Sequence, residues 1–223
     1  MPGQVVVPFK NDRISVHFDV MRDVRSPGAV LAETPPGSFV RVDHLPGSRA
    51  AASCAASRAH KAGDLVPILK GLYFKGTKTR YGMTRPTAEQ IAVQVLGPIG
   101  AGPVGVSAAR AFGLTTQIPA EPAFSVAGPV PTVRGVKVSK RNNMRRRDLK
   151  WNEVALLELL RGDWEHTVDD GWDALVAAAG AAVRDGRVRI ETVGDAVEGE
   201  RSPAARTHFN HLVEDLRNHG VQA

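Results

Sequence analysis

Polar and basic side chains recur at helical spacing in residues 48–62, a pattern suited to contact with a nucleic acid. At about 100° per residue, one side of a helix here carries donors and the other side carries alanine. The polar side holds Arg49, Ser53, Ser57, His60 and Lys61. The alanine side holds Ala51, Ala52, Ala55, Ala59 and Ala62. Such donors bond phosphate oxygens and base edges, so the stretch predicts a helix that presents positive charge to a polyanion.

A short hairpin is expected directly after this helix. Residues 65–69 and 72–75 are apolar runs joined at Lys70-Gly71, and such runs around a glycine-containing turn predict paired strands. Pro67 assigns the first run to a sheet edge, because proline cannot donate to a ladder. The residues expected to contact DNA are Ser48, Arg49, Ser53, Ser57, Arg58, His60, Lys61, Lys70, Lys75, Lys78 and Arg80.

A second basic region lies between residues 134 and 151, where eight lysines and arginines face one aspartate, a net charge of +7. The residues of this region expected to contact DNA or a protein partner are Lys137, Lys140, Arg141, Arg145, Arg146, Arg147 and Lys150. Arginine forks bind phosphate or carboxylate bidentately. Three anionic partners remain open: DNA, which we favour slightly, an acidic protein, and the chain's own residues 152–223, which carry a net charge of −7.

The elements before residue 48 complete a recognisable order. Ser26 and Pro27 predict the start of a short helix, and a second helix is expected from near Arg41 to Pro46-Gly47. Two short helices, a turn, a basic helix and a hairpin follow the order of a winged helix-turn-helix. The competing interpretation is a structural helical subdomain with a solvated basic face; we favour DNA binding.

The remaining chain predicts a helix-rich α+β protein with three parts. Residues 1–25 are an N-terminal extension with a helical pattern, residues 26–82 the winged helix-turn-helix DNA-binding domain, and residues 83–223 a C-terminal α/β domain with a small sheet and terminal helices. In that last part we expect helices at 87–96, 107–112, 153–160, 169–184, 190–197 and 202–216, and strands at 123–128 and 134–140. The boundary is expected at residues 82–87, because Pro86 disfavours helix before it.

Two motifs resemble ligand-binding sites, but the elements around them do not fit such sites. Residues 100–105, GAGPVG, match a dinucleotide fingerprint, but a helical pattern precedes them where the chemistry needs a strand. We interpret them as a tight glycine-rich connection. His208 and His211 lie three apart on a helix, a spacing that could hold a metal but more often forms a polar stripe. We therefore expect no cofactor, no metal and no enzymatic activity.

Composition agrees with a polyanionic partner. The formal charge is +6 and the sequence pI is about 9.8, values typical of nucleic-acid binding. Cys54 is the single cysteine, which suits a reducing compartment. No apolar run reaches membrane length, and no signal-like segment opens the chain. We expect a cytoplasmic protein that contacts no membrane.

The chain resembles the bacterial abortive-infection E-type antitoxins over about residues 26–220. In the winged helix of that family, a Ser-Arg pair near the helix end precedes a glycine, and a Gly-x-Tyr lies in the wing. Ser57, Arg58, Gly63, Gly71 and Tyr73 stand at those places. Residues 104–119, VGVSAARAFGLTTQIP, are similar to a second landmark that ends in Gly-Leu-Thr. The family differs in having leucine where this basic helix has alanine.

The resemblance implies an antitoxin that binds inverted repeats in its own promoter, represses it, and counteracts a nucleotidyltransferase-like toxin. We expect a monomer or a weak dimer that pairs on DNA. The main alternative is an ordinary winged-helix regulator whose C-terminal domain senses a small molecule at the glycine-rich connection. A third alternative is a nuclease with an unrecognised carboxylate set.

Overall fold

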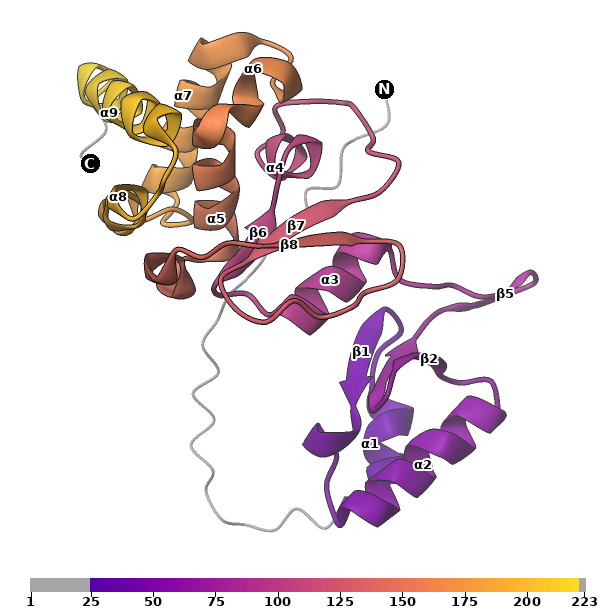
Figure 1. Ribbon diagram of the computed structural model, residues 1–223. Coiled ribbons are helices and arrows are strands. Elements are labelled where there is room, and N and C mark those ends of the chain that lie inside the picture. Colours follow the sequence, from indigo (N-terminus) through magenta and orange to yellow (C-terminus); the bar gives the residue numbers. More distant parts are fainter. Residues whose placement is uncertain (1–24, 221–223) are drawn as a thin grey trace.

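The computed structural model describes residues 25–220 of the chain. The fold is α+β and helix-rich, with small sheets, as the sequence predicted. Figure 1 shows the first helices and strands grouped at one end, a second small sheet in the middle, and the C-terminal helices at the other end. The helix expected within residues 1–25 lies outside the described residues, apart from Arg25.

The first helices begin at the caps that the sequence predicted. In α1 (Pro27–Glu33), Ser26 Oγ accepts from Ala29 N–H, and in α2 (Arg49–Lys61), Ser48 Oγ accepts from Ala51 N–H, each at 3.2 Å. Both bonds satisfy a backbone donor that has no partner inside the helix.

Alanine spaced at three and four residues forms the inner side of α2. Ala52, Ala55 and Ala56 are buried, and they pack with Leu31 of α1 and with Leu65. The small side chains let the two helices approach closely. Two alanines expected on this side, Ala51 and Ala62, are exposed, so the buried stripe is narrower than the pattern predicted.

The second helix expected from Arg41 is wrong. The chain instead forms strand β1 (Ser38–Arg41) and a single 3₁₀ turn, η1 (Val42–His44). Phe39 and Val40 pair with Phe74 and Tyr73 in antiparallel register, so the strand gains a backbone partner that local sequence does not reveal. Pro46 and Gly47 then end the turn before a helix can grow.

The hairpin is confirmed as β2 (Val66–Leu69) and β3 (Leu72–Lys75). The sheet order is β1-β3-β2, which leaves β2 and its Pro67 at the edge as predicted. A second hairpin that the sequence did not predict follows, β4 (Lys78–Thr79) and β5 (Gly82–Met83). The boundary expected after residue 82 falls within β5 and stays a prediction.

A second sheet and its covering helices occupy the middle of the molecule. Helix α3 (Ala88–Leu96) begins with a capping box in which Thr87 and Gln90 bond each other's backbone. The strands β6 (Ala101–Pro103), β7 (Ala123–Val126) and β8 (Lys137–Lys140) form a sheet in that order, with β7 and β8 parallel. Helix α4 (Val106–Ala111) follows β6. Arg41 Nη2 donates to the carbonyl of Gln94 and so joins β1 to α3.

The C-terminal helices form the largest core. They are α5 (Trp151–Glu158), the π-helical turn η3 (Leu159–Asp163), α6 (Trp164–Thr167), α7 (Gly171–Arg184), α8 (Ile190–Glu198) and α9 (Pro203–Asn218). A 3₁₀ segment, η2 (Met144–Asp148), leads from β8 toward α5. Residues 153–160 are all buried, so α5 and the start of η3 are central to this core.

Candidate nucleic-acid interface

Helix α2 exposes a row of side chains that have no partner within the described residues. Arg49, Ser53, Ser57, Arg58 and Lys61 are exposed, and none of them makes a side-chain hydrogen bond or ion pair with another described residue. Because α2 buries only alanine, no large apolar group interrupts this outer surface. The helix therefore offers donors and cations that are available to an external partner.

Two further residues predicted on this helix already have structural contacts. Ser48 Oγ caps α2, as described above. His60 Nδ1 lies 3.0 Å from the carbonyl oxygen of Leu65, and its ring centroid lies 6.4 Å from that of Tyr73. His60 therefore helps to connect the end of α2 to the hairpin while remaining exposed at its surface.

The basic residues of the hairpins are in different situations. Lys70 is exposed at the β2–β3 turn, where the sequence expected it. Lys75 Nζ instead donates to the carbonyls of Leu31 and Ala32 at 2.7 and 2.9 Å. It thus satisfies orphan carbonyls at the end of α1, and the prediction of Lys75 as a DNA contact is corrected.

Lys78 and Arg80 lie on the second hairpin rather than on the first. Lys78 Nζ forms an exposed ion pair with Asp64 at 2.6 Å. The guanidinium carbon of Arg80 lies 4.5 Å from the centroid of the Tyr81 ring. Both side chains remain at the surface, and the ion pair places Lys78 beside the residues that join α2 to β2.

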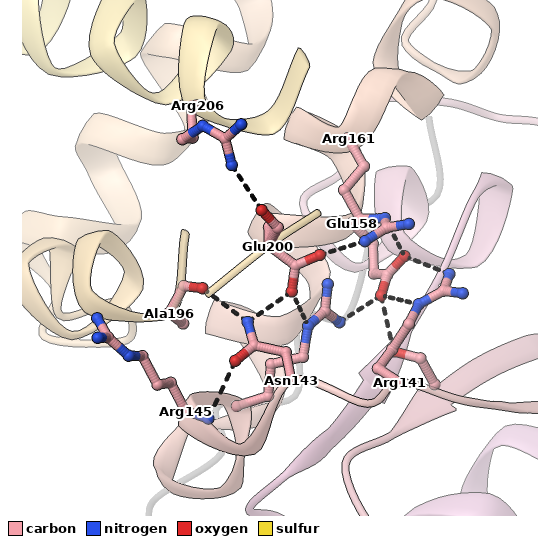
Figure 2. Close-up of polar contacts among 10 residues, drawn as sticks. Arg141, Asn143, Arg145, Glu158, Arg161, Ala196, Glu200 and Arg206 are labelled. Carbon is pink, nitrogen blue, oxygen red and sulfur yellow. Dashed lines mark hydrogen bonds and ion pairs between the residues drawn. The ribbon is translucent and has the colours of Figure 1, made fainter. Parts of the chain in front are cut away.

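The second basic region folds largely against the chain's own carboxylates. Arg141 donates from Nε and Nη2 to the two oxygens of Glu158 at 2.8 and 2.7 Å. Arg146 donates from Nη1 to Glu158 and from Nε to Glu200 at 2.6 Å. The Arg146 side chain is 1% exposed. Figure 2 shows Arg141, Glu158, Arg161 and Glu200 directed toward one another.

The arginines of this network lower the pKa of its buried carboxyl groups. Burial by itself would raise the pKa of Glu158, but the hydrogen bonds and charges of Arg141 and Arg146 outweigh it and lower the pKa to about 2. Burial also opposes ionisation of Glu200, yet Arg146, Asn143 and Arg161 lower its pKa. The buried carboxylates are therefore charged at neutral pH and hold the arginines in place.

Of the three anionic partners left open for this region, the chain's own acids therefore bind Arg141 and Arg146, and DNA, which was slightly favoured, does not meet these two residues. Arg146 is buried and Arg141 is half-buried and paired, so neither is available in this structure to DNA or to an acidic protein. Arg145 pairs with Glu198 at the surface, and Lys150 Nζ donates to the carbonyl of Gly186 at 3.2 Å. The members that remain exposed without a described partner are Lys137, Lys140 and Arg147.

Sequence reasoning did not identify the partners of these arginines. Asn143 Nδ2 donates to Glu200 and to the Ala196 carbonyl, each at 2.7 Å, and Arg161 donates to Glu200. The net charge of −7 after residue 151 was a usable signal. It indicated internal pairing, but it could not show which of many acids would meet which arginine.

Within the glycine-rich motif at residues 100–105, Ala101–Pro103 form strand β6, where the sequence predicted a loop. A Cβ on Gly102 would lie 2.6 Å from Val154 Cβ and 2.7 Å from the Trp151 carbonyl oxygen. Ala101, Gly102 and Pro103 are all buried. Gly102 therefore permits β6 to pack against α5.

The Gly-Leu-Thr landmark has a structural contact of its own. Asp169 accepts from Thr115 Oγ1 at 2.8 Å and from Thr116 N–H at 3.1 Å. These bonds lower the pKa of Asp169. They fasten the segment after α4 to the start of the helical core.

The paired histidines of α9 have protein neighbours. His208 Nδ1 lies 2.8 Å from the Leu160 carbonyl oxygen, and His211 stacks on Trp172 and lies 3.3 Å from Asp215. Within residues 25–220, no group of three or more histidine, cysteine, aspartate or glutamate side chains is arranged to hold a metal ion. No helix in this same range is long and apolar enough to cross a membrane.

The fold defines the chain as a mixed α+β, helix-rich protein with small sheets. It is similar to the crystal structure of the RV2827C protein from Mycobacterium tuberculosis, with a TM-score of 0.46 and 13% sequence identity over 85% of this chain and 75% of that one. Comparisons with family models and with curated proteins give no match.

Proposed function

We propose that this protein binds duplex DNA through α2 and the adjacent hairpins, and that it acts as a non-enzymatic antitoxin and autorepressor. One observation carries the DNA-binding part: Arg49, Ser53, Ser57, Arg58 and Lys61 lie exposed along one helix, without a partner among the described residues. A helix of this width fits the major groove, where arginine and serine reach base edges.

The charge around α2 supports a polyanion rather than a neutral ligand. Residues 65–88, which follow the helix, contain three lysines, two arginines and no acidic residue. Like charges gathered on one surface repel each other, and neutralisation by phosphates relieves that repulsion. The alanines of α2 pack with Leu31 of α1 and Val40 of β1 in one buried core, so the donors are carried on a folded support.

The antitoxin part of the proposal rests on the resemblance to the abortive-infection E-type antitoxins. Under this proposal, the protein binds inverted repeats in its own promoter, and residues 83–223 counteract a nucleotidyltransferase-like toxin. Co-expression with the adjacent gene tests this part. Growth arrest by that gene, relieved by this chain, supports it; an adjacent gene without such an effect contradicts it.

Substitution in α2 tests the DNA-binding part. Arg49→Ala and Ser53→Ala should each weaken binding to a duplex carrying the promoter repeats by about 1–3 kcal/mol and relax sequence preference. Fluorescence anisotropy on matched and scrambled duplexes measures both effects. Arg110→Ala, an exposed arginine on α4, is the matched control and should bind as the wild type does. Unchanged affinity in both α2 variants would remove α2 from the interface.

A further inference from the structure

The second hairpin, β4–β5, places an aromatic ring in solvent. Its strands pair Lys78 with Met83 and Thr79 with Gly82, which leaves Arg80 and Tyr81 as the two tip residues. Tyr81 is 83% exposed, more than any other large apolar side chain in the described part of the chain. Figure 1 shows this hairpin extending away from the rest of the molecule. Tyrosine is enriched at interfaces because it combines an apolar ring with a polar hydroxyl, so this position suits contact with a partner.

The base of the hairpin is closed by hydrogen bonds between its own two arms. Thr77 N–H donates to Thr84 Oγ1 at 2.8 Å, and Thr84 N–H donates to the Thr77 carbonyl at 3.0 Å. Gly76 is buried beside them, where a Cβ would lie 2.2 Å from the Thr84 carbonyl oxygen. The Lys78–Asp64 ion pair adds a link to the residues after α2. The two arms of the hairpin are thus held together at their base, and the exposed Lys78–Asp64 ion pair places that base beside the residues after α2.

The tip itself is also ordered by local bonds. Thr79 Oγ1 donates to the Gly82 carbonyl at 2.7 Å and accepts from Tyr81 N–H at 3.2 Å. The Arg80 guanidinium lies over the Tyr81 ring. The charged group and the ring therefore reach a partner together, with little conformational freedom left to lose.

We propose that the Arg80–Tyr81 tip enters the minor groove of duplex DNA beside the segment that α2 contacts. The proposal rests on the proposed DNA binding and names a second contact for it. Residues 65–88 contain no acidic residue. This charge favours an anionic partner such as DNA over a protein surface that carries both acidic and basic side chains. A two-residue tip fits the narrow groove, roughly 6 Å wide, where arginine meets enhanced negative potential. An apolar side chain in that groove acts as a wedge at a base step.

Two substitutions at the tip separate the contribution of the Arg80 charge to DNA binding from that of the Tyr81 ring. Arg80→Ala should lower the slope of log affinity against log salt by about 0.9, because one phosphate-region charge is lost. Tyr81→Ala should weaken binding about tenfold and leave that slope unchanged, since stacking carries no charge. Ile118→Ala removes a side chain that is 81% exposed elsewhere and should change neither quantity. Tyr81→Phe should bind as the wild type does.

Base substitution in the duplex identifies the groove. Replacing A·T pairs beside the promoter repeats by G·C adds an amino group to the minor groove, whereas inosine·C pairs lack it. The wild-type chain should bind the G·C duplex more weakly and the inosine·C duplex as it binds A·T. Tyr81→Ala should distinguish the three duplexes much less.

Each contrary result has one meaning. Tip variants that bind as the wild type, while Arg49→Ala loses affinity, overturn the tip contact and leave the proposed function standing. Inosine·C and G·C duplexes bound equally weakly overturn the minor-groove assignment. A change in sedimentation of Tyr81→Ala without a change in DNA binding overturns the proposal in favour of contact between copies. A wild-type chain that binds no duplex defeats the proposed function itself.

Discussion

Arg146 and Arg147 are neighbours in sequence with opposite environments. The Arg146 side chain is buried between Glu158 and Glu200, and its Nη2 has no hydrogen-bond partner among the described residues. Arg147 is exposed. A buried ion pair is weakly stabilising as a whole, but removing one partner leaves the other charge uncompensated in a medium that solvates it poorly.

Arg146→Ala should therefore lower the free energy of unfolding by about 3–5 kcal/mol. Arg147→Ala should change it by less than about 0.5 kcal/mol, as a surface substitution does. Urea unfolding followed by tryptophan fluorescence measures both. Equal effects of the two substitutions would mean that the network contributes nothing beyond surface charge.

Among the strands and helices, β6 depends on a glycine, which has no side chain, at residue 102. Strand β6 approaches α5 so closely that only glycine fits at residue 102. Val154 belongs to the buried middle of α5, so it cannot move aside without disturbing the main core. Cores of native density resist added volume in this way.

Gly102→Ala should lower the free energy of unfolding by about 1–3 kcal/mol. Gly128→Ala is the matched control, because a Cβ there has no atom within 4 Å and its backbone lies outside the left-handed region. Thermal unfolding by circular dichroism compares them. A Gly102→Ala variant that melts with the wild type would show that β6 and α5 can separate without cost.

Over the whole molecule, opposite charges from separate parts of the chain meet, since residues 134–151 carry a net charge of +7 and residues 152–223 one of −7. The acids of the C-terminal part meet the arginines of residues 141–146 and thereby join the β8 side of the middle sheet to α5, η3 and the segment before α9. Burial opposes ionisation of Glu153, yet hydrogen bonds from Arg189 and Lys150 lower its pKa as well. Several distant segments thus depend on carboxylates that remain charged.

Stability should consequently fall in acid. Glu158 has a pKa of about 2 in the fold against an ordinary 4.5, so its contribution, about 3 kcal/mol, is complete above pH 4.5 and is lost as the pH falls toward 2. Glu200 acts in the same sense. Asp163, whose pKa is raised by burial and by Glu158, acts in the opposite sense.

The three tryptophans, at positions 151, 164 and 172, all report on this part of the chain. Their fluorescence should follow the acid loss of stability between about pH 5 and pH 2. Glu158→Gln should be less stable at pH 7 and show a flatter pH dependence over this range. A variant with the wild-type pH dependence would exclude Glu158 as its source.

The sequence by itself determined the features that depend on residues close along the chain. Ser26, Ser48 and Thr87 begin helices because a cap bonds an amide three residues away, and Pro67 specifies a sheet edge because it lacks a donor. The alternation of alanine and donors on α2 likewise follows from helical geometry. Local chemistry suffices for these elements, and for naming the exposed residues of α2.

Only the tertiary structure decided the features that need a distant partner. Residues 38–41 became a strand because β3 supplies its hydrogen bonds, and residues 101–103 of the glycine-rich motif became a strand because β7 pairs with them and α5 packs on them. The basic region divided into buried and exposed arginines because Glu158 and Glu200 lie beside Arg146 only after α5 and the segment between α8 and α9 are in place. The sequence shows that opposite charges exist, but their pairing depends on distances of a few ångströms that the fold alone sets.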